Sequence, residues 1–140
     1  HPMAVEIETY RNTIYPWQCD NMGHMNTQFY CAIFDSASFH ILGRLRRFSE
    51  IQANHCGWAD VKLTLEYKHE THSGALVYVK SRFTRVGSKA IEYHHELFNT
   101  ETGDLHATAD VVTVLFDLKA RKALPVDDQM RAAAKELGVG

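Results

Sequence analysis

The densest group of chemically active side chains in the sequence falls within eight positions, in the stretch "DNMGHMNT". It combines the carboxylate of Asp20, the ring of His24, the amide of Asn26 and the hydroxyl of Thr27, with Gly23 between them. A carboxylate can attack an electrophilic carbon or act as a general base toward water. Asp20 is therefore the first candidate for a catalytic residue.

A long helix is expected to begin directly behind this group. Over residues 27–45, apolar side chains recur at steps of three and four, the spacing of one buried helix face. They are Tyr30, Ile33, Phe34, Ala37 and Ile41. Asn26 or Thr27 suits the N-cap position. The peptide N–H groups at about 26–28 would then lack intrahelical partners and carry the positive end of the helix dipole, which stabilises negative charge.

The rest of the chain has the pattern of an antiparallel sheet. Residues 58–69 alternate, with Ala59, Val61 and Leu63 on one face and Asp60 on the other, which predicts a half-buried strand. Further strands are expected at 75–86, 90–99 and 105–117, and at 4–18, where Pro16 interrupts the strand. Helices are expected at 47–55 and, behind the N-cap Asp127, at 128–137. The predicted fold class is α+β, one domain over 1–140 in which a curved antiparallel sheet wraps a long central helix.

Composition and charge exclude several classes of function. The chain has 140 residues, 45% of them hydrophobic and 23% charged, with a net charge of −2, so no basic field would recruit nucleic acid. It has no apolar run of about 18 residues and no signal peptide, so no membrane partner is expected. Three widely spaced cysteines, Cys19, Cys31 and Cys56, favour free thiols and a cytoplasmic location. The opening "HPM" is expected to be a tag remnant ahead of a starting Met3.

Other catalytic chemistries find little support. The nine histidines include His69 and His72 in "HETH", and His94 and His95, which would point to opposite faces of one strand. Neither pair has cysteine or carboxylate partners at the spacing of a zinc site, so no metal is expected. The sequence contains no G-x-S-x-G elbow, and Cys19 is expected to be a packed thiol.

The spacing Asp20-x-x-Gly23-His24-Met25-Asn26…Tyr30, between the first strand and the long helix, resembles the signature of the hotdog-fold thioesterases. Within them it is similar to the 4-hydroxybenzoyl-CoA thioesterase-like acyl-CoA thioesterases, and the strand order and the "RVGSKAI" turn at 85–91 fit over almost the whole chain. The "GHMN" variant also resembles plant-type fatty acyl carrier protein thioesterases. The resemblance implies hydrolysis of an acyl-CoA or acyl carrier protein thioester, with no cofactor, by a homodimer or homotetramer with sites at subunit interfaces.

The resemblance also implies a role for each residue of the motif. Asp20 matches the catalytic carboxylate, as nucleophile or as general base toward water. Thr27 matches the oxyanion hole at the helix start, and Gly23 would let the loop approach the thioester. His24 and Asn26 would shape the loop, orient water or contact the substrate carbonyl.

Residues outside the motif are expected to contribute to binding. Arg82, Arg85 and Lys89 flank the turn at Gly87 and match the positions of cationic contacts to the nucleotide of CoA. Asp35, on the long helix, is a second candidate carboxylate. The depth of the acyl pocket depends on residues such as Trp17, Phe29, Phe34 and Trp58, and the identity of the acyl group stays open.

Two other functions stay open. Enoyl-thioester hydratases and dehydratases of the same fold pair a carboxylate with a histidine, as Asp20 and His24 could, although "CDNMGHMN" lacks their "G-D-x-N-P-x-H" stretch. A thioester-binding or scaffold protein without catalytic activity is the third possibility.

Overall fold

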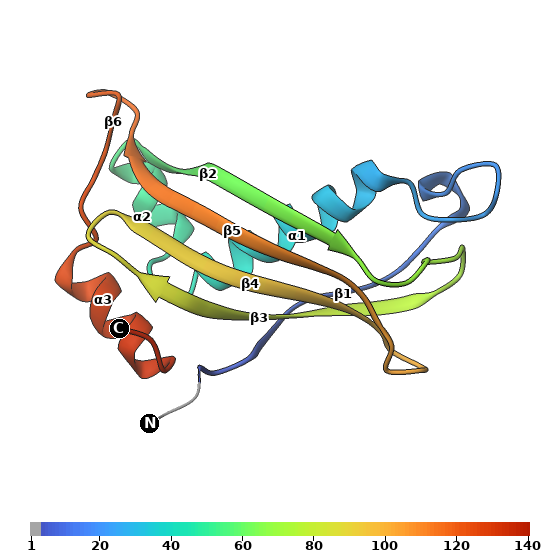
Figure 1. Cartoon of the computed structure of the whole chain (residues 1–140). Helices are drawn as coiled ribbons and strands as arrows, with labels where there is room; N and C mark the ends of the chain where they lie inside the picture. The colour runs from blue at the N-terminus through green and yellow to red at the C-terminus, as the bar shows by residue number, and fades with distance from the viewer. Residues whose placement is uncertain (1–3) are drawn as a thin grey trace.

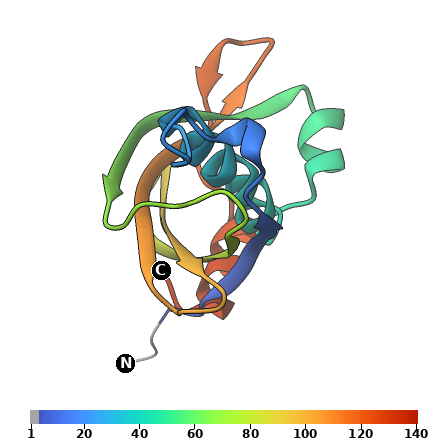
Figure 2. The same ribbon diagram turned by 90° about the vertical axis from the view of Figure 1, so that its right-hand side faces the viewer.

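The chain is built around one long helix, α1 (Thr27–Leu42), which a curved antiparallel sheet wraps on one side (Figure 1, Figure 2). The computed structural model describes residues 4–140, so the expected tag remnant at 1–3 lies outside the described residues. The predicted α+β class, with a central helix and a wrapping sheet, is confirmed.

The sheet has the strand order β1-β3-β4-β5-β2, with β6 paired to β5, and every pairing is antiparallel. The strands are β1 (Ile7–Thr13), β2 (Cys56–Tyr67), β3 (Leu76–Val86), β4 (Ala90–Asn99), β5 (Leu105–Asp117) and β6 (Lys122–Ala123). Because β3, β4 and β5 follow one another through short turns, they form the middle of the sheet, and β1 and β2 are its edges.

Helix α1 forms because its N-cap and its apolar spacing agree. The Asn26 side chain accepts a hydrogen bond from the Gln28 N–H. The helix ends at Leu42, three positions before the predicted end at 45, and Gly43 follows it. The face toward the sheet is buried and consists of Tyr30, Ile33, Phe34, Ala37, Ser38, Ile41 and Leu42. Its N-terminal half packs on Val77, Val79 and Leu97, so the sheet holds α1 in a fixed position.

Two shorter helices cover the end of the sheet farthest from the start of α1 (Figure 1). They are α2 (Phe48–Ala53) and α3 (Asp128–Glu136), and Asp127 caps α3 as predicted. The predicted strand over 14–18 is wrong, because Pro16 begins a short 3-10 helix (Pro16–Gln18) instead. Among residues 4–140, none of the helices combines the length and the apolar character needed to cross a bilayer.

Strand β2 differs from its prediction in which side chains face α1. The pairing with β5 shifts between Asp60 and Lys62, so Val61 forms a bulge and is 66% exposed. A bulge reverses the alternation beyond it, and Asp60 therefore lies on the same face as Leu63, lining a cavity beside α1. The predicted half-burial holds for Cys56–Ala59 and for Leu65, whereas Leu63 is 43% and Tyr67 52% exposed at the sheet edge.

Candidate active site

The Asp20 side chain lies in a tight loop between the 3-10 helix and α1. The Asp20 N–H donates to His24 O at 2.8 Å, and the Gly23 N–H donates to Asp20 O at 3.0 Å. The Asp20 Oδ1 atom accepts from the Met22 N–H at 2.9 Å and the His24 N–H at 3.2 Å. These bonds hold the carboxylate through one oxygen, and no hydrogen bond reaches Oδ2 from the described residues.

Gly23 is needed for the conformation of this loop. Its φ is +81°, in the region where side chains other than glycine are strained, and a Cβ would meet no atom within 4 Å. The backbone turn therefore explains this glycine without invoking contact with a substrate. Free space beside it is compatible with the close approach expected from the sequence.

The start of α1 offers one N–H group to a ligand. The Asn26 N–H donates to Gln18 O at 2.8 Å, and the Gln28 N–H donates to the Asn26 side chain at 3.1 Å. The Thr27 N–H has no hydrogen-bond partner among residues 4–140. The set of free amides expected at 26–28 is thus reduced to Thr27, and Asn26 is a helix cap.

Residues of the segment that precedes β3 hold the Asp20 loop in place through hydrogen bonds. The Met25 N–H donates to Thr71 O at 2.7 Å, while the buried Tyr30 hydroxyl donates to Thr71 Oγ1 at 3.0 Å. Thr71 Oγ1 is also 2.7 Å from His106 Nδ1, and burial lowers the pKa of His106, which keeps that ring neutral. Tyr30, the last residue of the sequence motif, therefore acts in positioning the loop.

A group of three possible metal ligands lies beside this loop. His24 Nε2 is 3.3 Å from Glu70 Oε2, and the rings of His24 and His72 are 4.8 Å apart. The ligand atoms of all three lie within 4.8 Å of one another, and histidine and carboxylate are ligands that zinc accepts. Sequence reasoning considered His72 with His69 and missed this set, because His24 joins it only through the fold. The expectation of no metal stays a prediction.

Cys19, beside Asp20, is poorly suited to act as a nucleophile. Burial, and to a lesser degree the Asp20 charge, raise the pKa of the Cys19 thiol. The thiolate, which is the reactive form, is therefore disfavoured. This agrees with its expected role as a packed thiol, and the three cysteines are free.

The predicted cationic residues lie far from Asp20 within one chain. Arg82 pairs with Glu96 at 3.4 Å and Arg85 with Glu92 at 3.2 Å, while Lys89 is exposed in the β3–β4 turn. The Asp20 loop is at the start of β3 and this turn is at its end (Figure 1). Arg82 and Arg85 are six and nine residues along β3 from Leu76, or about 20 and 30 Å at about 3.3 Å per residue, so one chain does not bring the two groups together.

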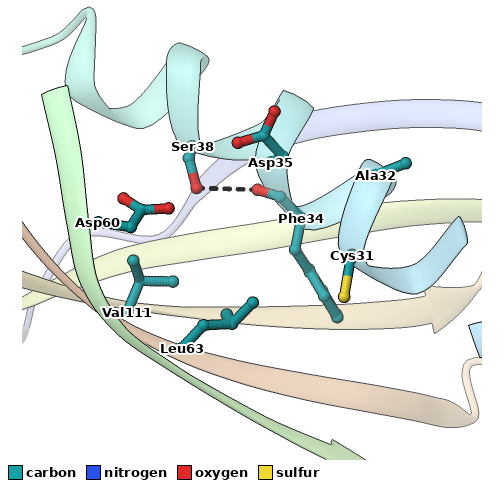
Figure 3. A pocket seen from close by; sticks show the side chains of 8 residues that line it. All are labelled: Cys31, Ala32, Phe34, Asp35, Ser38, Asp60, Leu63 and Val111. Carbon is teal, nitrogen blue, oxygen red and sulfur yellow. Dashed lines mark hydrogen bonds between the residues drawn. The ribbon is translucent and has the colours of Figure 1, made fainter. Parts of the chain in front are cut away.

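The four residues expected to shape an acyl pocket separate into two places. Trp17 and Phe29 form an edge-to-face pair at 5.3 Å beside the Asp20 loop. Phe34 lines a cavity between α1 and β2 (Figure 3), and Trp58 lines an adjoining one. The second candidate carboxylate, Asp35, lines both cavities.

Comparison with known proteins defines the class. Residues 14–134 match the model of the thioesterase-like superfamily, so the chain belongs to that superfamily. A betainyl-CoA thioesterase of Pseudomonas aeruginosa is 22% identical over 136 residues, covering 96% of this chain and 86% of the relative.

Two solved structures share the fold. A 1,4-dihydroxy-2-naphthoyl-CoA thioesterase of Synechocystis has a TM-score of 0.81 at 18% identity, over 95% of this chain and 98% of its own. A Staphylococcus aureus protein in complex with CoA has a TM-score of 0.86 at 14% identity, over 98% and 87%. The protein is thus a thioester hydrolase with the hotdog fold.

Proposed function

We propose that the protein hydrolyses an acyl-CoA thioester between Asp20 and the start of α1. The observation that carries this proposal is a carboxylate anchored through one oxygen, seven residues before a helix N–H that has no partner in the described chain. Asp20 attacks the thioester carbonyl or activates water for the attack, and the Thr27 N–H donates to the oxygen as it gains negative charge. If Asp20 attacks, the C–S bond breaks to release CoA and leaves a mixed anhydride on Asp20, which water then hydrolyses to the carboxylic acid and the free aspartate. If water attacks, the C–S bond breaks and the carboxylic acid forms directly. In both routes the proton of the CoA thiol comes from water.

Coenzyme A is the proposed carrier of the acyl group. The Pseudomonas aeruginosa relative is named for a CoA thioester, and the Staphylococcus aureus neighbour is in complex with CoA. An acyl carrier protein is the alternative carrier. A hydratase activity is less well supported, because the His24 ring contacts Glu70 and His72, and only the His24 backbone bonds to the Asp20 carboxylate.

We further propose that the working form is a homodimer or homotetramer. The apolar side chains Val61, Leu63 and Tyr67 are exposed on the edge strand β2, where a second copy would cover them. A second copy could also bring its Arg82, Arg85 and Lys89 to the CoA phosphates, which the same residues of one chain do not reach from their end of β3.

The test is release of free thiol from a panel of acyl-CoA thioesters, followed with a thiol-reactive dye. Asp20→Asn keeps an oxygen for the two backbone hydrogen bonds, so its fold should survive. Its kcat should nevertheless fall by several orders of magnitude, as should that of Asp20→Ala. Asp104→Asn, an exposed acid in the β4–β5 turn, is the matched control. Wild-type rates in both Asp20 variants would exclude this carboxylate, and loss of crotonyl-CoA absorbance without thiol release would indicate a hydratase.

A further inference from the structure

Two histidines and a glutamate meet where the Asp20 loop contacts the segment before β3. His24 belongs to the loop, and Glu70 and His72 belong to the segment. The nitrogen and oxygen atoms with which they could bind a metal all lie within 4.8 Å of one another. Among residues 4–140, this is the one group of three or more histidine, cysteine or acidic side chains with such an arrangement.

The main chain holds the two histidines directly opposite each other. His24 and His72 form an antiparallel bridge, and the residues on either side of this pair are joined by backbone hydrogen bonds of 2.7 and 3.2 Å. The pair itself is thus of the non-hydrogen-bonded type, in which the two side chains share a face and approach most closely. Their rings are accordingly 4.8 Å apart, at an angle of 77°. Two imidazole groups are therefore brought together before any ligand binds.

Glu70 supplies a third ligand at a distance that suits zinc. Its Oε2 atom is 3.3 Å from His24 Nε2. Two ligand atoms that bind one tetrahedral zinc ion, each about 2.05 Å from it, are about 3.3 Å apart. The side chains of Glu70 and His72 are exposed, so rotation about their side-chain bonds can close the remaining separations without moving the backbone.

The three side chains have few competing partners. Within residues 4–140, neither the His24 ring nor the His72 ring forms a hydrogen bond, and Glu70 forms an ion pair with His24 alone. Two imidazoles and one carboxylate form a ligand set that zinc accepts, with its fourth position left to water. Imidazole ligands also favour zinc and similar transition metals over Mg²⁺ and Ca²⁺, which prefer oxygen ligands.

We propose that His24, Glu70 and His72 bind a zinc ion, which fastens the Asp20 loop to the segment before β3. The His24 ring binds the ion, while the His24 N–H donates to Asp20 Oδ1 at 3.2 Å, so the ion restrains the carboxylate through this one residue. The site positions the loop and does not depend on the proposed thioesterase activity. It replaces the expectation of no metal, which considered the histidines only by their spacing along the sequence.

The test measures zinc binding by the full chain after treatment with a chelator. Competition with a chromophoric chelator gives the stoichiometry and the dissociation constant, and Mg²⁺ and Ca²⁺ are ions that should not bind. We expect one zinc ion per chain, and an affinity at least about tenfold lower in His72→Gln and in Glu70→Gln, because even the outer partners of metal ligands are worth about 10- to 100-fold. Both side chains are exposed, so these variants should fold. His40→Gln, which replaces an exposed histidine of α1, is the matched control and should keep the wild-type affinity.

Two further measurements locate the ion and test its effect on the loop. X-ray absorption at the zinc edge should show two imidazole nitrogens and a carboxylate oxygen at about 2.0–2.2 Å. Zinc should raise the melting temperature of the wild type and slow amide hydrogen exchange in residues 20–26 and 70–73, but do neither in His72→Gln. Three results would overturn the inference: a wild-type dissociation constant above about 1 mM, equal affinities in the wild type and His72→Gln, or bound zinc that leaves exchange in residues 20–26 unchanged.

Discussion

Replacing Thr27 with proline tests the proposed oxyanion donor with little disturbance of the fold. Thr27 is the first residue of α1, where proline is tolerated because its missing N–H would have no intrahelical partner. The preceding Asn26 already has the extended conformation that a following proline requires, with φ −69° and ψ 146°. The substitution therefore removes one N–H and keeps the helix.

The expected loss of activity follows from the value of one such donor. Removing an oxyanion-hole donor costs about 10²- to 10³-fold in kcat, or about 2.7–4 kcal/mol. We expect Thr27→Pro to lose this factor in kcat with a smaller change in KM, because the interaction strengthens only in the transition state. The free energy of unfolding should change by less than about 1 kcal/mol, since proline also restricts the unfolded chain. Thiol-release kinetics and urea unfolding measure these two quantities.

Two control variants separate the N–H from other effects. Thr27→Ala removes the hydroxyl but keeps the N–H, and should lose far less kcat than Thr27→Pro. Asp128→Pro makes the same kind of change at the first residue of α3, after an extended Asp127 with φ −82° and ψ 170°, and should keep wild-type kcat. A folded Thr27→Pro variant with more than about a tenth of the wild-type kcat would refute the assignment of this N–H.

Three further predictions concern stability and assembly. Burial lowers the pKa of His95 to about 3. Below the ordinary pKa of histidine, near 6.5, His95 therefore becomes protonated in the unfolded chain but stays neutral in the folded chain. Between neutral pH and pH 5, the free energy of unfolding should therefore fall by about 2 kcal/mol more in the wild type than in His95→Gln, as measured by urea unfolding. An equal pH dependence in the two proteins would contradict this cause. Tyr30→Phe should cost about 1 kcal/mol through its lost hydrogen bond to Thr71, and an unchanged melting temperature would argue against that role. Val61→Glu should reduce the mass in light scattering to that of one chain, and a single-chain mass for the wild type would exclude the proposed assembly.

Much of the fold could be predicted because local spacing and packing agree. The apolar steps from Tyr30 to Ile41 fix the buried face of α1, and the Asn26 cap fixes where it begins. The central strands were predictable for the same reason, since their alternation matches one covered face. At Pro16 the local signal was present, but it marked a 3-10 turn rather than an interruption within a strand.

The parts that could not be predicted depend on contacts between distant segments. The placement of Asp60 on the side of β2 that faces α1 follows from a one-residue shift in the pairing of β2 with β5, which simple alternation cannot reveal. The meeting of His24 with Glu70 and His72 likewise needs the loop before β3 to reach the loop before α1. The roles of Asp20 and Thr27 stay predictions from the resemblance, supported by their geometry.

The hydrogen bonds beneath the Asp20 loop have a consequence for how a newly made chain acquires activity. They join Met25 to Thr71, and Gly23 to Ser73, across roughly fifty intervening residues, a closure whose entropic cost the assembled sheet must offset. The hydrogen bonds of α1 and those within residues 20–24 are local, but the bonds that fix the Asp20 loop to residues 71–73 are not. A nascent polypeptide ending before Thr71 would thus contain every residue of the motif and still lack the bonds that fix the Asp20 loop against the sheet.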